Sequence, residues 1–270
     1  SPAGRWWTDV TVPVLSPGAL AFAGQRLTAY RHFWRSSLIS SVLEPALFLA
    51  SMGLTLGILV DRGPGLPGGV SYLSFLAPGL LAAAAMQTGA FESTYPVLGA
   101  IKWDKTYDAV LATPTRVTDL LAGQLLYVAF RVTTAATLFL GVLVLFGAAD
   151  SWLVVLAVPA ALLTGLAFAA PITAYAATLD NDSGFAAVQR FLIIPMFLFS
   201  GTFFPVSQLP TVFEWVAYAT PLWHGVSLAR GLALGTLDAG AGLLHVGYLA
   251  LWVVGGVLLA RRAYRRRLVA

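Results

Sequence analysis

Long stretches without a charged residue alternate with short charged segments along the chain. The intervals 63–91, 132–149, 151–179, 191–213 and 239–260 contain no Asp, Glu, Lys or Arg, and 36–60 contains only Glu44. About 20 predominantly apolar residues form a helix long enough to cross a membrane. The pattern therefore predicts an all-α polytopic membrane protein with six spans, at about 36–60, 70–98, 118–148, 152–178, 185–204 and 243–260.

The composition points to the same fold class. Of the 270 residues, 58% are apolar and 10% are charged, and the mean hydropathy is +0.80. A soluble domain carries about 25% charged residues, and one of this size has too little interior to bury so much apolar surface. A soluble enzyme, a disordered chain and a fibrous protein are therefore excluded. The absence of cysteine excludes disulfides, a thiol nucleophile and a thiolate metal site.

The distribution of basic residues predicts the orientation. Six spans place both termini on one side, and 13 of the 16 Lys and Arg residues then lie on that side. Because cytoplasmic loops are enriched in Lys and Arg, we expect the N-terminal segment 1–16 and the basic tail 261–270 to be cytoplasmic. The net charge of +4 then reflects topology and contact with anionic lipid rather than a nucleic-acid partner.

Residues 17–35 are predicted to form an interfacial helix ahead of the first span. Ser16 and Pro17 suit the cap and the first helical turn. An apolar stripe at helical spacing follows, made of Ala23, Leu27, Tyr30 and Trp34. A basic amphipathic helix with aromatic residues is typical of one that lies in the headgroup plane. The alternative is a solvated arm.

The longest loop on the basic side, 102–114, combines aromatic and charged residues. Apolar side chains recur at helical spacing, namely Trp103, Tyr107, and Val110 or Leu111. Charged residues surround them, namely Lys102, Asp104, Lys105 and Asp108. A short amphipathic helix that exposes aromatic residues is typical of a docking element for a partner. The alternative is an interfacial helix whose aromatic residues lie among lipid headgroups.

Residues 205–235 are too apolar for a free loop and too interrupted for a span. Three prolines break the segment, namely Pro205, Pro210 and Pro221. We expect two short helices, at 209–219 and 222–234, that enter the membrane from outside and return. A seventh span is the alternative, but it would move the basic tail away from the cytoplasm.

Three ionisable residues fall within the predicted spans: Glu44, Glu92 and Arg131. Buried charges in membranes are costly and are usually paired. We therefore hypothesise that Arg131 neutralises Glu44, Glu92 or both, either as a static clamp between helices or with a direct role in passage of a substrate.

No catalytic pattern accompanies these charges. No His and Glu residues have metal-ligand spacing, and neither a nucleophile elbow nor a phosphate-binding loop ending in Lys-Ser or Lys-Thr is present. We expect no cofactor bound by this chain, so any ATP hydrolysis belongs to another chain.

The chain resembles the permease subunit of a type-2 ABC exporter. The motif near the fifth span consists of Ser200-Gly201, Phe204-Pro205, Leu209-Pro210, Pro221 and Arg230-Gly231. A second match, within 72–124, contains Phe75–Gly79, Phe91–Tyr95 and Tyr107–Leu111 and is similar to permeases for nodulation lipo-oligosaccharides and daunorubicin-type drugs. Glu44-Pro45 also matches an acidic-Pro pair common in the first span.

The resemblance implies an ATP-driven exporter of amphiphilic cargo in a bacterial plasma membrane. The loop 102–114 would be the coupling helix that docks on a cytoplasmic P-loop ABC ATPase, which uses ATP and Mg. Two ATPases and a second permease, identical or paralogous, would complete the unit, and 205–235 would close the outer end of the path. The cargo would be a drug, a glycolipid or a lipo-oligosaccharide. The alternatives are an ion-coupled secondary carrier and a membrane-embedded lipid-modifying enzyme.

Overall fold

Every regular element in the described part of the chain is a helix. The computed structural model describes residues 16–32, 34–63, 66 and 69–269, without the side chains of 34–42, 44, 45 and 54. The first half contains α1 (Pro17–Tyr30), α2 (Trp34–Arg62), α3 (Tyr72–Glu92), α4 (Tyr95–Lys102), α5 (Thr106–Leu111) and α6 (Val117–Leu145). The second half contains η3 (Trp152–Leu156), α7 (Ala157–Thr178), α8 (Ser183–Val188), η4 (Gln189–Ile193), α9 (Ile194–Phe199), η5 (Val206–Gln208), α10 (Thr211–Tyr218), α11 (Pro221–Leu234) and α12 (Ala239–Leu268).

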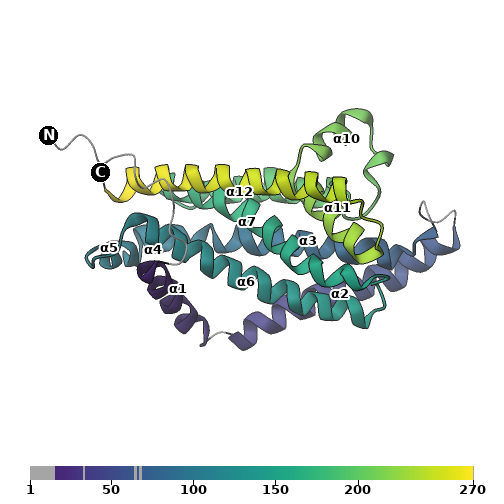
Figure 1. Ribbon diagram of the computed structural model, residues 1–270, viewed down its shortest axis with the longest axis horizontal. Helices are drawn as coiled ribbons and strands as arrows, with labels where there is room; N and C mark the ends of the chain where they lie inside the picture. The colour runs from purple at the N-terminus through teal and green to yellow at the C-terminus, as the bar shows by residue number, and fades with distance from the viewer. Residues whose placement is uncertain (1–15, 33, 64–65, 67–68, 270) are drawn as a thin grey trace.

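The long helices run side by side in an elongated bundle (Figure 1). The short helices α4 and α5 and the C-terminal end of α12 lie together at one end, which we call the basic end. The short helix α10 lies toward the opposite end. The helix α7 is central, because it packs against α3, α6, α11 and α12.

Four helices in this part of the chain are long and apolar enough to cross a membrane. They are Tyr72–Lys102, Val117–Leu145, Trp152–Thr178 and Ala239–Leu268, and they correspond to four of the six predicted spans. The predicted span 185–204 contains a shorter apolar helix, Ser183–Phe199. The predicted span 36–60 falls within α2, whose side chains are described only in part.

Several predicted bounds differ from the structure. The helix predicted over 17–35 ends at Tyr30. The last helix continues through the arginines to Leu268, because arginine has a high helix propensity and does not end a helix. The N-terminal segment 1–16 lies outside the described residues except for Ser16, as do the side chains of Trp34 and Glu44.

Small residues allow the central helices to approach closely. A Cβ atom added at Gly89 of α3 would lie 2.3 Å from the carbonyl oxygen of Gly165 in α7. A Cβ atom added at Gly256 of α12 would lie 2.6 Å from Cδ of Pro171 in α7. Because membrane helices associate largely by close packing, small residues at these crossings favour the observed arrangement.

The substitution Gly89→Ala is expected to lower the free energy of unfolding by about 1–3 kcal/mol, because α3 and α7 must separate to admit the methyl group. Reversible unfolding in dodecyl sulfate, followed by circular dichroism, measures this change. The matched control is Gly141→Ala in α6, where an added Cβ atom meets nothing within 4 Å. Equal stability of the two variants would contradict the close approach.

Candidate functional site

A buried ion pair joins α3 to α6. Arg131 donates from Nε to Oε1 of Glu92 across 2.8 Å, and the two side chains are 15% and 9% exposed. The Arg131 guanidinium also lies 4.6 Å from the centre of the Tyr30 ring of α1. The structure thus places two of the three predicted intramembrane charges together, whereas the side chain of Glu44 lies outside the described residues.

Polar side chains connect this pair to α1. Gln124 of α6 donates to the backbone carbonyl of Glu92 across 3.0 Å, and Arg26 of α1 donates to the side-chain oxygen of Gln124. Arg26 also lies over the ring of Tyr127, 4.7 Å from its centre. The helix α1 is therefore attached to the bundle by the same network that contains the ion pair.

The face that α1 presents to the bundle differs from the predicted stripe. Its buried residues are Ala19, Phe22 and Ala23, and its Arg26 contacts α6 rather than solvent. Residues 19, 22, 23, 26 and 30 share one helical face. The apolar pattern of the sequence does not predict this face, because the face includes Arg26.

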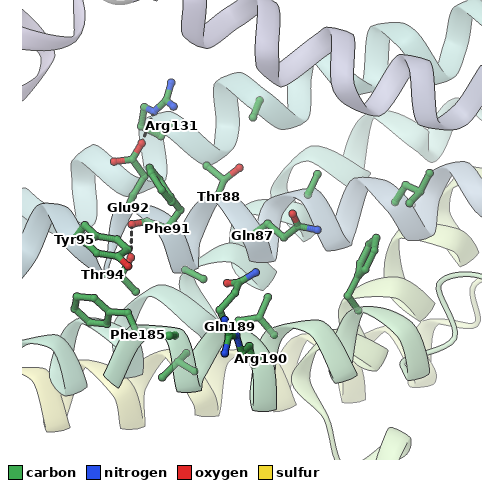
Figure 2. A pocket seen from close by; sticks show the side chains of 18 of the residues that line it. Gln87, Thr88, Phe91, Glu92, Thr94, Tyr95, Arg131, Phe185, Gln189 and Arg190 are labelled. Carbon is green, nitrogen blue, oxygen red and sulfur yellow. Dashed lines mark hydrogen bonds and ion pairs between the residues drawn. The ribbon is translucent and has the colours of Figure 1, made fainter. Parts of the chain in front are cut away.

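A cavity of about 730 Å³ lies beside the ion pair, between α3, α6 and the helix 183–199. Figure 2 shows Glu92 and Arg131 on one side of it and Gln189 and Arg190 across from them. Its aromatic lining consists of Phe48, Phe91, Tyr95, Phe139, Phe185 and Phe197. Its other polar lining residues include Gln87 and Thr88. A mostly apolar cavity with a few polar groups is typical of a ligand site.

A π-helical turn, η4 (Gln189–Ile193), forms part of the cavity wall. The N–H of Ile194 donates to the carbonyl of Gln189, five residues earlier. Pro195 follows directly, and a proline in a helix has no N–H and crowds the preceding turn. Single π turns inside helices are frequent at functional sites. Here the turn contributes Gln189, Arg190 and Ile193 to the cavity.

The charge of the cavity is positive. Arg131 compensates Glu92, whereas Arg190 is exposed and belongs to none of the three ion pairs found among the described residues. An anionic or neutral polar group is therefore compatible with this cavity, and a cation would meet no uncompensated carboxylate among the residues that line it.

The predicted docking loop forms two short helices rather than one. The helix α4 ends at Lys102, and α5 begins at Thr106 after Lys105, whose φ of 48° is left-handed. Trp103 is 61% exposed, and Asp104, Lys105 and Asp108 are also exposed. Leu111 is half-buried. These exposed groups form an aromatic and charged surface at the basic end.

Tyr107 corrects the prediction for this loop, because its ring is entirely buried. Its hydroxyl lies 3.3 Å from that of Tyr264 in α12, and its ring packs edge-on against Phe22 of α1. Burial raises the pKa of the Tyr107 hydroxyl above its ordinary value. Tyr107 therefore fastens the loop to α1 and α12 and presents nothing to a partner.

Lys102 is held by an acid that the sequence analysis did not single out. Its Nζ lies 2.9 Å from Oδ1 of Asp180, which also accepts from Arg267 across 2.7 Å. The hydrogen bond from Arg267, followed by that from Lys102, lowers the pKa of Asp180 to about 2. The carboxylate stays ionised at any pH above that value, so this link among α4, α12 and the loop after α7 is lost only as the pH falls through about 2.

At the opposite end, Arg230 of α11 joins α3 to the loop after α9. It donates from Nε to the carbonyl of Phe75 across 2.9 Å and from a terminal nitrogen to the carbonyl of Gly201 across 2.8 Å. Its guanidinium lies 3.6 Å from the centre of the Phe75 ring. Gly201 has a φ of 80°, which favours glycine. Two members of the predicted motif, 29 residues apart, thus meet here.

The other motif residues define bends and close contacts. Pro205 and Pro210 directly precede η5 and α10, and Pro221 is the first residue of α11. Ser200 is buried, whereas Phe204 and Leu209 are half-buried. A Cβ atom added at Gly231 would lie 2.9 Å from Leu237. The two expected short helices are present as α10 and α11, with bounds shifted by one or two residues.

Two histidines that are distant in sequence meet near this end. Nδ1 of His224 in α11 lies 2.8 Å from Nδ1 of His245 in α12, so one nitrogen donates and the other, unprotonated, accepts. Within the described ranges, no group of three or more His, Cys, Asp and Glu residues has the geometry of a metal site.

Comparison with known proteins identifies the family. The model of the ABC-2 type transporter family matches residues 23–234. Nodulation protein J of Rhizobium leguminosarum bv. viciae is 33% identical over 96% of this chain and 98% of its own length. Its counterparts from R. leguminosarum bv. trifolii and Rhizobium meliloti (strain 1021) are 35% and 32% identical over 87% and 89% of this chain, and each match covers 90% of the relative. The chain therefore belongs to the ABC-2 type transporter family.

Proposed function

We propose that the chain is the permease subunit of an ATP-driven exporter that moves an amphiphilic cargo outward across a bacterial plasma membrane. The cavity between α3, α6 and the helix 183–199 carries the proposal. Two of its walls, α3 and α6, belong to helices long enough to cross a membrane, and it combines aromatic side chains with a small polar region. An amphiphile requires both kinds of surface.

The cavity chemistry favours cargo with a neutral or anionic head. The head would lie near Gln189 and Arg190, and the apolar part would lie against Phe139 and Phe197. A cationic drug gains no attraction from Glu92, because Arg131 already pairs with it. Among the expected cargoes, a glycolipid or a lipo-oligosaccharide fits better than a cationic drug.

The remaining topology follows from the basic residues. The basic end is cytoplasmic in this proposal, with both termini there, because Lys and Arg are enriched in cytoplasmic loops. The helices α2 and 183–199 complete six spans, α1 lies at the interface, and 205–235 forms the outer re-entrant segment.

A P-loop ABC ATPase would dock on the exposed surface formed by Trp103, Asp104, Lys105 and Asp108. The complete unit would contain two copies of this ATPase, one for each of its two permeases. ATP and Mg belong to that partner, and a second permease, identical or paralogous, completes the unit. Movement of the docking loop would pass to the cavity through α4, an eight-residue helix that joins α3 just after Glu92. An eight-residue helix is about 12 Å long, so the docked partner would act close to the cavity.

Co-expression with the proposed P-loop ABC ATPase partner, followed by purification into nanodiscs, tests the proposal. We expect the ATPase to co-purify and its ATP turnover to rise when an amphiphile is added. A chain that binds no ATPase, or an ion gradient that drives transport without ATP, would instead support the ion-coupled carrier.

The variant Arg190→Gln is expected to weaken half-activation by an anionic amphiphile about 10-fold, the size of one lost charge-assisted hydrogen bond. An alkyl glucuronide and the alkyl glucoside of equal chain length are the probes, and ATP turnover is the measurement. The glucoside response should stay unchanged. Arg62→Gln, outside the cavity, is the matched control. Equal losses for both probes would contradict an electrostatic role.

A further inference from the structure

A second cavity, of about 600 Å³, lies between α7 and α12 at the basic end. One part of its wall is apolar and comes from both helices, through Pro171, Ala174, Tyr175 and Leu259. The other part is basic and comes from the end of α12, through Arg262, Arg266 and Arg267. We call this feature the α7–α12 groove.

The basic part of the α7–α12 groove carries two uncompensated charges. Arg262 and Arg266 are four residues apart on α12 and so share one helical face, where like charges repel each other. Both are exposed, and neither belongs to an ion pair found in the described residues. Arg267 is already paired with Asp180, and no carboxylate lines the groove. An anion that contacts both free guanidiniums would relieve the repulsion.

The apolar part restricts what that anion can be. Leu259 is 54% exposed and Tyr175 is 38% exposed, and both belong to helices long and apolar enough to cross a membrane. In a membrane crossed by these helices, this wall would be open to the acyl chains of the lipid. A free phosphate would use only the arginines, whereas a phosphate that carries acyl chains would use both parts of the groove.

We propose that the α7–α12 groove binds an anionic phospholipid. Its phosphate accepts hydrogen bonds from Arg262 and Arg266, because guanidinium groups match phosphate oxygens in geometry and charge. Its acyl chains lie along Leu259, Tyr175 and Ala174. Basic pockets between membrane helices on the cytoplasmic side, where the proposed topology places this end of the bundle, bind such headgroups. This proposal concerns a resident lipid and does not depend on the cargo of the exporter.

The α7–α12 groove lies next to the ion pairs that connect α12 to the docking loop. Arg267 lines the groove and pairs with Asp180, which in turn holds Lys102 at the end of α4. A bound lipid would therefore hold the end of α12 next to the segment that we propose to contact the ATPase.

Native mass spectrometry of the full chain, titrated with dioleoyl-phosphatidylglycerol or dioleoyl-phosphatidylcholine, tests the proposal. We expect selective retention of phosphatidylglycerol. The double variant Arg262→Gln/Arg266→Gln should weaken its binding about 25-fold, since each arginine near anionic lipid contributes about fivefold. The matched control Arg265→Gln removes the same kind of charge outside the groove and should weaken binding less than the loss of either Arg262 or Arg266 alone.

A conservative double variant and a competing anion distinguish three explanations for a change in lipid binding: a lipid site, a small-anion site and an unfolded variant. The variant Arg262→Lys/Arg266→Lys should keep the preference for phosphatidylglycerol, and its unfolding in dodecyl sulfate shows whether the chain remains folded. Equal retention of phosphatidylcholine, or equal loss in Arg265→Gln, would overturn the site. Displacement of the lipid by an excess of inorganic phosphate would overturn the lipid assignment in favour of a small-anion site.

Discussion

The variant Arg131→Ala is expected to lower the free energy of unfolding by about 3–5 kcal/mol, the usual cost when one partner of a buried ion pair is removed. Glu92, with a side chain only 9% exposed, would lose the guanidinium that compensates it from 2.8 Å away. The charge has little access to water, so the variant is expected to express poorly and to unfold at lower dodecyl sulfate concentrations.

The double variant Glu92→Gln/Arg131→Met separates the ion pair from the packing of the two side chains. Replacing both charges often costs little, because the desolvation of two ions is removed together with their attraction. We expect the double variant to recover at least about half of the stability lost in Arg131→Ala. A double variant whose loss equals the sum of the losses in Glu92→Gln and Arg131→Met would show that the pair is not coupled.

The variant Trp103→Ala is expected to weaken binding of the ATPase at least about 30-fold, because an exposed tryptophan buried by a partner is a typical hot spot worth about 2 kcal/mol or more. Trp103 is 61% exposed at the basic end and is flanked by exposed charges. The permease itself should stay folded, because the ring contributes little to the interior. Biolayer interferometry with the nanodisc-embedded permease and the purified ATPase gives the affinity.

Tyr107 provides the contrasting variant for that measurement. The substitution Tyr107→Phe removes a buried hydroxyl that is hydrogen-bonded to Tyr264, so it should leave the affinity for the ATPase within about twofold. If Tyr107→Phe weakened binding as much as Trp103→Ala, or if Trp103→Ala bound normally, the exposed surface would not be the docking site.

The long apolar helices are the part of this fold that can be predicted from sequence. Charge-free intervals predicted α6, α7 and α12, because a span must be both long and apolar, and both requirements are visible in the residues. The break after Glu92 and the π turn at Gln189–Ile193 were not predicted. Both depend on how neighbouring helices pack rather than on hydrophobic spacing.

Residues near the predicted site were harder to assign than the spans. Helical spacing placed Trp103 and Tyr107 on one docking element, yet Tyr264 and Phe22 cover Tyr107. Asp180 was missed because its partners, Lys102 and Arg267, lie 78 and 87 positions away. Periodicity shows that a side chain has an apolar neighbour but does not show which segment supplies it.

The shortness of the helix Ser183–Phe199 has a consequence for the surrounding bilayer. A helix of 17 residues is about 25 Å long, less than the roughly 30 Å of a hydrocarbon core. In the proposed arrangement of six spans, it would require the membrane beside it to become thinner or its flanking residues to extend toward the headgroups. The helix also forms one wall of the cavity. In that arrangement the headgroups of the two leaflets would come closest together at this wall, and the proposed cargo head would have the shortest apolar distance to cross there.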